Sequence, residues 1–343
     1  MTGGAETAGV GAHPAAVIGG LGSWLPSRVV TNADLVERLD TTEDWISSRT
    51  GILERRICDP STLTSEIAAF AGARALRSAD EDGAEAVVLA TTTPDRTCPA
   101  SAPLVATRLG LSGAAAFDIA AVCTGFLYGL AVASGLVVSG AADRVLLIAA
   151  DRFSTLMDPR DRSTVPIFGD GAGAVLLRRG RAGDPGAVGH VVLGSDGAHQ
   201  DLITVRSADA ASHDPAGTRA GLFEMHGRKV FRHAVERMSE AAAEALAAAG
   251  WDVADVDRLI AHQANARITG TVANGLGIPA DRRVENIAEV GNTAAASVPI
   301  LLAQAAAEGR LRSEHRVLMT AFGGGLTWGA TALVWPELKP YID

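Results

Sequence analysis

The chain has 343 residues, 48% hydrophobic and 20% charged, so it holds enough apolar material for a sizeable core and is neither disordered nor a small disulfide scaffold. The net charge of -9, from 30 basic and 39 acidic residues, argues against a general nucleic-acid binder with a broad basic face. Three cysteines without CxxC spacing predict reduced thiols and argue against a metal site.

The N-terminal segment, residues 1–16, lacks the basic start and apolar stretch of an export signal, so we expect a flexible tail there. The most apolar run, residues 127–141, is interrupted by Gly and Ser and is shorter than the roughly 18 residues that a membrane span needs. We therefore expect a cytoplasmic protein that binds neither membranes nor nucleic acids.

Short aliphatic runs alternate with helix-like stretches along the rest of the chain. The sequence predicts one helix after the cap-like residue Thr64 and an Ala-rich helix that ends at Gly250. Alternation of strands and helices predicts an α/β fold built in layers. The strands are expected at residues 86–91, 144–150, 174–177, 188–193, 258–261, 316–320 and 330–335.

The order of elements repeats once along the chain. A strand ending in AVVLATTTPD is followed by AAVCTGFLYGLAVASGLVVSG and the strand VLLIAA, just as DRLIAHQANAR is followed by AEVGNTAAASVPILLAQAAAEG and VLMTAF. Such a repeat predicts two similar halves, with Cys123 and Asn292 in equivalent strand-to-helix turns that meet at a pseudo-twofold axis. Chance similarity between two α/β segments is the alternative.

Three polar residues are candidates for chemistry. Cys123 lies in VCTGF directly before a predicted helix, whose N-terminal N–H groups would stabilise a thiolate and lower its pKa. His262 follows the predicted strand DRLIA, at a strand end where catalytic groups are common. The alternatives are a buried structural cysteine, a structural histidine and, for Asn292 in GNTAAAS, a helix N-cap.

The glycine motifs do not indicate a dinucleotide site. GGLGSW at residues 19–24 and GDGAGAVLL at residues 169–177 do not fit the Rossmann fingerprint. FGGG at residues 322–325 follows a predicted strand, and its backbone could point an N–H at a developing oxyanion. Basic residues gather in GRKVFRHAVER, which indicates either a docking patch for an acidic partner or a solvated helix face.

Seven motifs follow one another along the chain: GSWLPSRVVTNADL, DTTEDWISSRTGILERR, FDIAAVCTGF, DPRDRSTVPIFGDGAGAVLL, HQANARI, GNTAAASVP and AFGGGLTWG. In this order they resemble β-ketoacyl-acyl carrier protein synthase III, a condensing enzyme of the thiolase superfamily. The resemblance implies a thiolase-like α/β fold, with two similar βαβαβαββ halves in five layers, α-β-α-β-α. It implies an N-terminal half at residues 17–185 with the nucleophile, a C-terminal half at residues 186–343 with His and Asn, and a homodimer.

The resemblance also implies a mechanism and its residues. Cys123, His262 and Asn292 would form the catalytic triad, and the backbone N–H groups of Cys123 and Gly324 the oxyanion hole. Cys123 would take the acyl group of an acyl-CoA and pass it to malonyl-acyl carrier protein in a decarboxylative condensation that initiates fatty acid biosynthesis, without a metal or redox cofactor. The contacts to coenzyme A would be Thr41, Trp45, Arg49, Arg162, Gly227 and Asn265.

The expected acyl pocket includes Cys98, Phe153 and Phe168. Cys98 stands where some family members carry a bulky aromatic that enters the partner's pocket, so we expect primers larger than acetyl, with Phe153 taking back some volume. The segment ITGTVANGLG has no positive charge where the family often has lysines, which favours a dedicated pathway carrier. The remaining carrier-docking residues would be Arg228, Arg232 and Arg267.

Several related activities are alternatives. A starter-unit synthase or acyltransferase of polyketide or antibiotic biosynthesis would use the same triad. Degradative thiolase is disfavoured because the glycine-rich C-terminal segment holds no second cysteine. The hydroxymethylglutaryl-CoA synthase branch needs a catalytic glutamate, and Glu81 and Glu85 precede Cys123 without a matching motif. A non-catalytic partner of the chain-length-factor kind would lack the nucleophile.

Overall fold

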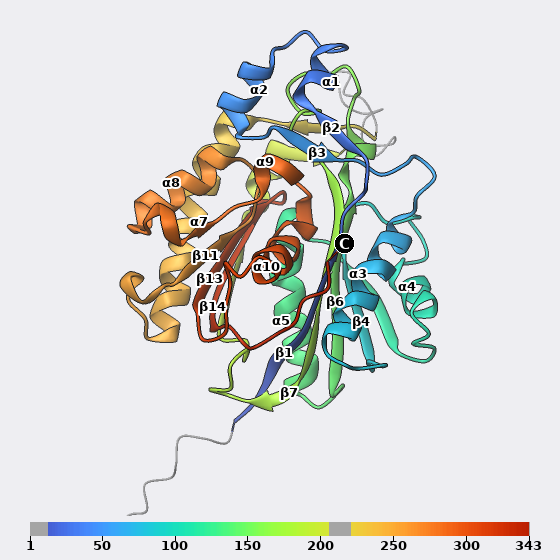
Figure 1. The fold of residues 1–343 in the computed structure, drawn as a ribbon, viewed down its shortest axis with the longest axis vertical. Helices are drawn as coiled ribbons and strands as arrows, with labels where there is room; N and C mark the ends of the chain where they lie inside the picture. The colour runs from blue at the N-terminus through green and yellow to red at the C-terminus, as the bar shows by residue number, and fades with distance from the viewer. Residues whose placement is uncertain (1–12, 206–220, 343) are drawn as a thin grey trace, which may run out of the picture.

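Two five-stranded sheets form the centre of the computed structural model, which describes residues 13–205 and 221–342 (Figure 1). One sheet has the order β1-β7-β6-β4-β5 and the other β12-β11-β13-β14-β8. The first contains β1 (Pro14–Trp24), β4 (Ala86–Ala90), β5 (Ala115–Ile119), β6 (Arg144–Arg152) and β7 (Asp170–Arg181). The second contains β8 (Val191–Ser195), β11 (Arg258–Ala261), β12 (Arg283–Val284), β13 (Arg316–Gly323) and β14 (Thr327–Val334).

Helices cover both sheets and fill the space between them. The helices α5 (Gly125–Val138) and α10 (Ser297–Ala307) contact strands of both sheets, so they form the central layer. The outer layers are α3 (Thr64–Ser78) with α4 (Ala102–Arg108) on one side and α7 (Gly227–Ala249) with α8 (Ala266–Leu276) on the other. The expected five-layered thiolase-like architecture is confirmed.

Glycines allow the central layers to pack closely. A Cβ on Gly129 of α5 would lie 2.4 Å from the Leu147 side chain, and one on Gly173 of β7 would lie 2.8 Å from the backbone nitrogen of Ile300. Each position therefore needs a residue without a side chain. Apolar residues around most of α5 and α10 are what a helix buried between two sheets requires.

Each of the seven predicted strands overlaps an observed strand, and Gly250 ends α7 in the left-handed conformation as expected. Three strands of the two five-stranded sheets, β1, β5 and β12, were not predicted, nor were the short strands of the two-stranded sheets. Residues 14–16 belong to β1 rather than to a tail, because Ala15 and Ala16 are buried and pair with β7. The rest of the expected tail, up to residue 12, lies outside the described residues.

The internal duplication has a constant spacing along the chain. The sequence offset from the start of β4 to the start of β11 equals the offset from β6 to β13 and from α5 to α10. This equality confirms that the order of elements repeats. It also corrects one detail, since the same offset makes Cys123 equivalent to Ala295, and Asn292 lies slightly earlier in the equivalent turn.

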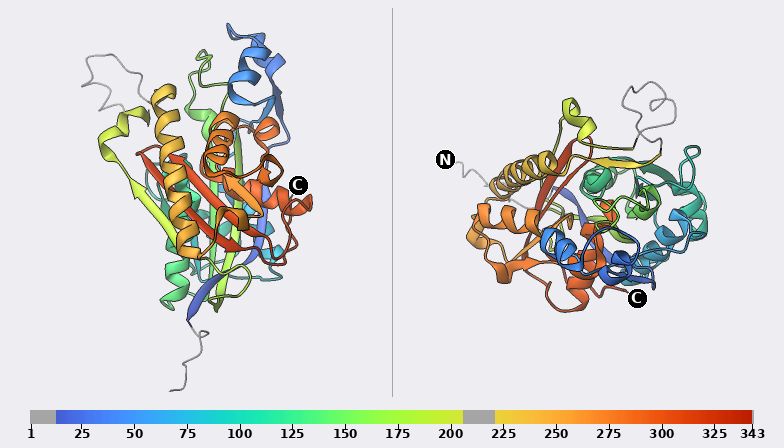
Figure 2. Two further views of the ribbon diagram at one scale, coloured as in Figure 1. Left: turned by 90° about the vertical axis from the view of Figure 1, so that its left-hand side faces the viewer. Right: turned by 90° about the horizontal axis from the view of Figure 1, so that it is seen from above.

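A small cap lies at one end of the sheets (Figures 1 and 2). It contains β2 (Val29–Thr31), α1 (Asn32–Val36), α2 (Glu43–Thr50) and β3 (Glu54–Arg56), and α9 (Ile287–Val290) packs against β3. The buried Arg55 guanidinium donates hydrogen bonds to the Val30 and Pro166 carbonyls at 3.0 and 2.7 Å and to the Asn32 side chain at 2.8 Å. These hydrogen bonds connect the cap to the segment that precedes Phe168.

In the described part of the chain, no helix is long and apolar enough to cross a membrane.

Candidate active site

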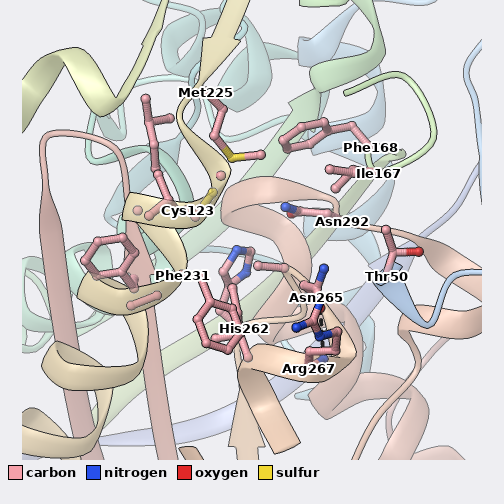
Figure 3. A pocket seen from close by; sticks show the side chains of 18 of the residues that line it. Thr50, Cys123, Ile167, Phe168, Met225, Phe231, His262, Asn265, Arg267 and Asn292 are labelled. Atoms are coloured by element: carbon pink, nitrogen blue, oxygen red, sulfur yellow. Dashed lines mark hydrogen bonds between the residues drawn. The ribbon is translucent and has the colours of Figure 1, made fainter. Parts of the chain in front are cut away.

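A cavity of about 390 Å³ brings Cys123, His262 and Asn292 together (Figure 3). Its walls come from both halves of the molecule, including α2, α7, the segment that follows β11 and the end of β13. The three candidate residues lie far apart in the sequence, and the duplicated fold places them in one space.

Cys123 lies in a single 3-10 turn, Val122–Thr124, that leads directly into α5. Val122 has a φ of 46°, a left-handed conformation that is unusual for a branched residue and turns the chain sharply before the cysteine. Burial, followed by the charge of the buried Asp151, raises the pKa of the Cys123 thiol above its usual value. The expected lowering of this pKa is wrong, because desolvation outweighs the helix terminus.

His262 follows the last residue of β11, and its backbone N–H donates to the Thr320 carbonyl at 2.9 Å. The side chain is 2% exposed, and burial lowers the pKa of His262 to about 3. Neither ring nitrogen has a hydrogen-bond partner within the described residues. The imidazole is therefore neutral near pH 7, with one donor and one acceptor directed at the cavity.

Asn292 is held on both sides of its backbone. Its N–H donates to the Ile167 carbonyl at 2.9 Å, and its carbonyl accepts from the Gly169 N–H at 2.9 Å. Its side-chain oxygen accepts the Ala294 N–H at 2.9 Å, which leaves the amide NH₂ as a donor for the cavity. Asn292 is not the N-cap of α10, which is Ala296.

The end of β13, with the glycines that follow it, lies against the cysteine turn. A Cβ on Gly323 would lie 2.9 Å from the Cys123 backbone nitrogen, so only glycine fits there. A Cβ on Gly324 would instead face the Ile203 and Val122 side chains at 3.2 and 3.3 Å. Gly323 therefore lies directly against the Cys123 turn, and Gly324, the predicted oxyanion donor, is the next residue.

Four of the expected coenzyme A contacts line the cavity, namely Trp45, Arg49, Gly227 and Asn265. The Asn265 amide donates to the Arg49 carbonyl at 2.9 Å, and its oxygen accepts the Arg267 N–H at 2.9 Å. Asn265 therefore joins α2 to the start of α8 at the cavity mouth. The Arg49 guanidinium lies 5.9 Å from the centre of the Trp45 ring.

The other two expected contacts, Thr41 and Arg162, are not among the lining residues. The Arg162 guanidinium donates to the Asp40 carbonyl at 2.7 Å and lies 3.6 Å from the Asp40 carboxylate. Arg162 is thus adjacent to the Thr41 segment, on the outside of the cavity.

One wall of the cavity is aromatic. Phe153 and Phe168 line it as expected, with ring centres 4.5 Å apart, and Phe223 of β10 (Phe223–Met225) meets them edge-on at 5.3 and 5.0 Å. Phe223 was missed, because it belongs to no motif and comes from a separate two-stranded sheet with β9 (Ile203–Val205). Cys98 is exposed and does not line the cavity of its own chain.

The expected docking arginines divide into two groups. Arg228 at the start of α7 and Arg267 at the start of α8 are exposed and line the cavity mouth, whereas Arg232 is exposed on α7 and is not a lining residue. Arg237 pairs with Glu240 at 2.8 Å, so it does not extend this group. Positive charge therefore gathers at the mouth.

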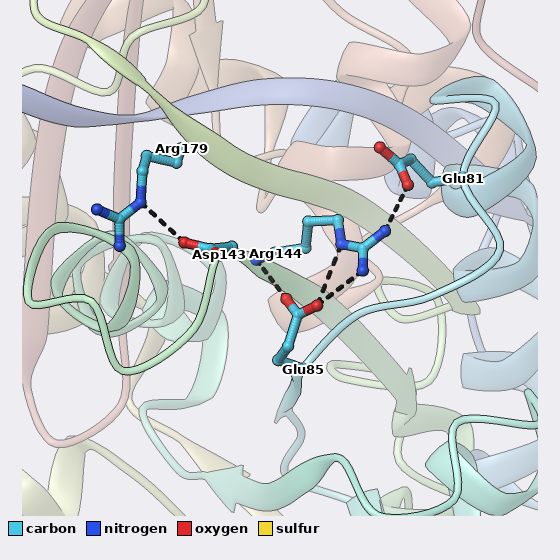
Figure 4. Close-up of polar contacts among 5 residues, drawn as sticks. All are labelled: Glu81, Glu85, Asp143, Arg144 and Arg179. Atoms are coloured by element: carbon cyan, nitrogen blue, oxygen red, sulfur yellow. Dashed lines mark hydrogen bonds and ion pairs between the residues drawn. The ribbon is translucent and has the colours of Figure 1, made fainter.

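Two glutamates considered for a different reaction are engaged elsewhere. Glu81 and Glu85 pair with Arg144 at 2.6 and 2.7 Å at the start of β6, and Asp143 pairs with Arg179 nearby (Figure 4). This cluster lies at the opposite end of β6 from the cavity. Neither glutamate lines the cavity, which removes the candidates for a hydroxymethylglutaryl-CoA synthase.

Among the described residues, no group of three or more His, Cys, Asp or Glu side chains has the arrangement of a metal site.

The chain matches two related family models over separate stretches of its length. Residues 117–197 match 3-oxoacyl-[acyl-carrier-protein (ACP)] synthase III, and residues 246–335 match the C-terminal region of the same synthase.

Curated relatives and solved structures give the same result. The chain is 57% identical to β-ketoacyl-[acyl-carrier-protein] synthase III 3 of Streptomyces coelicolor, over 95% of this chain and 99% of the relative. The crystal structure of the Pseudomonas aeruginosa synthase III is 48% identical, with a TM-score of 0.90 over 95% of this chain and 100% of that chain. The priming β-ketosynthase of the R1128 polyketide pathway is 35% identical, with a TM-score of 0.89 over 96% and 99%. The chain therefore belongs to the β-ketoacyl-[acyl-carrier-protein] synthase III family of acyl-transferring condensing enzymes.

Proposed function

We propose that Cys123, His262 and Asn292 join the acyl group of an acyl-CoA to malonyl-acyl carrier protein, with loss of carbon dioxide, to begin fatty acid synthesis. The observation that carries this proposal is the meeting of the three side chains in one cavity, where they supply a thiol, a neutral imidazole and an amide NH₂. A nucleophile and two neutral donors suit acyl transfer followed by enolate stabilisation.

The first step is acylation of Cys123. The sulfur bonds to the acyl carbon, the bond from that carbon to the sulfur of coenzyme A breaks, and the thiol proton passes through His262 to the departing thiolate. Because burial raises the thiol pKa, the proton leaves as the sulfur attacks rather than beforehand. The Cys123 N–H and an N–H of the Gly323–Gly324 segment stabilise the oxyanion, each by roughly 3 to 4 kcal/mol.

The second step uses His262 and Asn292. His262 and the Asn292 NH₂ donate hydrogen bonds to the thioester oxygen of the malonyl group, where negative charge develops as carbon dioxide leaves. The resulting carbanion bonds to the acyl carbon on Cys123. The carbon–sulfur bond to Cys123 then breaks, and the thiolate takes up a proton.

The cavity mouth suits the two carriers of these thioesters. Trp45 provides a ring for stacking, and Arg49 a guanidinium for phosphate, which supports coenzyme A binding there. Thr41 and Arg162 would extend this contact outside the mouth. Arg228 and Arg267, with Arg232 further along α7, are the residues we assign to carrier-protein docking, because an acidic carrier is attracted to local positive charge.

A homodimer is part of the proposal, as the family resemblance implies. The strand β5 forms one edge of its sheet, and the loop that carries Cys98 is exposed. Across a dimer, Cys98 would reach the partner's acyl pocket. A molar mass of twice 35.2 kDa in solution is the expected result, whereas a mass of one chain would contradict this part.

The alternative of a starter-unit ketosynthase or acyltransferase for polyketides is not favoured. The curated relatives at 57% and 48% identity are β-ketoacyl-[acyl-carrier-protein] synthases III, whereas the R1128 priming enzyme is 35% identical. A preference for a specialised acyl group would revive this alternative.

The test is intact-protein mass after incubation with a panel of acyl-CoAs, then with malonyl-acyl carrier protein. We expect a single acyl adduct that the malonyl carrier removes as a β-ketoacyl product. The Cys123→Ala variant should acquire no adduct. Cys58→Ala is the matched control, because this thiol is also buried but lies outside the cavity, and its adduct should match wild type. A normal adduct on Cys123→Ala would overturn the assignment.

A further inference from the structure

Asp151, a buried carboxylate at the end of β6, is bonded entirely within the protein. It is 0% exposed, and one of its oxygens accepts the Thr92 backbone N–H at 2.7 Å together with the hydroxyls of Thr91 and Thr93 at 3.3 and 3.2 Å. The other oxygen accepts the Ala295 N–H at 3.0 Å. Asp151 therefore joins the N-terminal half to the turn before α10 in the C-terminal half.

The duplication shows which residue of the other half corresponds to Asp151. The constant offset between the two halves makes Asp151 equivalent to Gly323, just as it makes Cys123 equivalent to Ala295. The end of the central strand in each half thus reaches the helix turn of the other half. At the cysteine turn, β13 ends in Gly323, where there is no room for a side chain. At the Ala295 turn, the corresponding residue of β6 is Asp151, whose carboxylate accepts the equivalent N–H.

The Ala295 turn is also the turn that orients Asn292. The residue before it, Ala294, has a φ of 48° and donates its N–H to the Asn292 side-chain oxygen at 2.9 Å. A left-handed alanine is strained, so neighbouring bonds must hold it in place. The bond from Asp151 to the next N–H along the chain is one such bond, and it comes from the other half of the molecule.

We propose that Asp151 is a positioning residue for the decarboxylation step: its carboxylate takes, at the Asn292 turn, the place that the substrate oxyanion takes at the Cys123 turn. It fixes the turn that points the Asn292 NH₂ at the malonyl thioester. This inference rests on the proposed function and adds a residue to it. Asp151 is not a lining residue of the cavity, and it reaches Asn292 only through Ala295 and Ala294.

The same carboxylate acts on the cysteine turn in the opposite sense. Its negative charge contributes to the raised pKa of the Cys123 thiol. Loss of the charge should therefore make the thiol easier to deprotonate while it loosens the Asn292 turn. A residue with a merely structural role would weaken both half-reactions together.

The experiment compares wild type with Asp151→Asn in the two half-reactions measured separately. In Asp151→Asn, the amide oxygen can still accept a hydrogen bond, but the amide NH₂ can only donate. Either the Thr92 or the Ala295 N–H therefore loses its acceptor. Carbon dioxide release from a malonyl thioester should fall roughly 10- to 100-fold, the effect of a small displacement of a positioned group. Acylation of Cys123 by acetyl-CoA should stay within about threefold or rise. The pH midpoint of thiol alkylation should move down.

The matched control is Asp170→Asn. Asp170 is an equally buried carboxylate that accepts the Cys58 and Ser154 N–H groups and makes no bond to the Asn292 turn. Any loss in this variant should fall on both half-reactions alike. Asp151→Ser, whose hydroxyl accepts one N–H, replaces the Asn variant if the latter does not fold.

The outcomes separate the inference from the proposed function. A selective loss of decarboxylation in Asp151→Asn supports the inference. Equal losses in both half-reactions, or no loss in either, overturn it and leave the proposed function intact. Failure of the wild-type protein to release carbon dioxide from a malonyl thioester overturns both.

Discussion

The turn at Cys123 and the turn at Asn292 are two copies of one structure with different chemistry. In each, a single 3-10 turn leads into a central helix, and Val122 and Ala294 adopt the same left-handed conformation at equivalent positions of the two halves. At the first turn the neighbouring strand ends in Gly323, which has no side chain beside the Cys123 N–H. At the second turn the strand offers Asp151, which accepts the Ala295 N–H.

In the proposed function, this difference divides a two-step reaction between the two halves of a duplicated fold. The first turn would supply the nucleophile and keep its backbone donors for the substrate. The second turn has the Ala295 N–H bonded to Asp151, and it would hold the Asn292 amide in place. Substitutions that change only one of the two turns should therefore affect one half-reaction more than the other.

The largest expected effect comes from filling the space beside the nucleophile. In Gly323→Ala, the new Cβ would lie 2.9 Å from the Cys123 backbone nitrogen and displace this oxyanion donor. Acylation should fall roughly 100- to 1000-fold, the loss measured when one such donor is removed. Stopped-flow release of coenzyme A measures this step.

Gly135→Ala in α5 is the control for that substitution. Among the described residues, no atom outside the helix's own nearby backbone lies within 4 Å of the Cβ position at Gly135. The alanine should therefore leave acylation unchanged and stabilise the helix by about 0.5 to 1 kcal/mol. A Gly323→Ala variant that acylates as fast as Gly135→Ala would show that the cysteine turn needs no open neighbour.

His262, which faces the cavity with both turns, should link stability to pH. Its pKa is about 3 in the folded protein against 6.5 for an ordinary histidine, so the unfolded chain binds a proton below pH 6.5 that the folded protein does not. The free energy of unfolding should decrease as the pH is lowered. Between pH 6.5 and 4.5, wild type should lose roughly 2 kcal/mol more of this free energy than His262→Gln. Urea unfolding at each pH measures this, and parallel losses in the two proteins would contradict the burial of a neutral imidazole.

A substitution at Phe223 should affect only the reaction with the acyl-CoA, whose acyl group is transferred to Cys123. Phe223→Leu removes ring volume next to Phe153 and Phe168, so the kcat/KM ratio for hexanoyl-CoA over acetyl-CoA should rise by about tenfold. Decarboxylation of a malonyl thioester without a primer should not change, because that group contacts the other turn. An equal change in both reactions would place Phe223 outside the acyl pocket.

The smallest effect is expected at the far end of β6 from Asp151. Glu81 pairs with Arg144 where both side chains are about one-third exposed, so Glu81→Gln should lower the free energy of unfolding by less than about 1 kcal/mol. Both half-reactions should match wild type. A selective loss of decarboxylation here would mean that β6 transmits strain along its whole length.

Much of the fold could be predicted from the sequence because the duplicated strands are short, apolar and bounded by turn residues. The strand β1 was missed since its glycines are unfavourable in an isolated strand. In the structure, a Cβ on Gly20 would lie 2.2 Å from the Ala75 carbonyl oxygen, so α3 packs directly on the backbone of β1. That requirement exists only after the layers have assembled.

The site was predictable to the extent that motifs carry it. Cys123, His262 and Asn292 lie in long family motifs, and the structure brings them into one cavity. The raised thiol pKa could not be predicted, because it depends on burial rather than on position in a helix. Asp151 resembles an ordinary strand-end acid in the sequence, and Phe223 lies outside any motif, so only their neighbours in space identify them.

The central claim is that the two turns carry separate half-reactions, and a crossed measurement on two variants tests it. Cys123→Ala should acquire no acyl group yet still release carbon dioxide from malonyl-acyl carrier protein. Asn292→Ala should form the acyl-enzyme at the wild-type rate yet release carbon dioxide at least about 10-fold more slowly. Loss of both activities in either variant, with the fold intact, would contradict the division of labour between the turns.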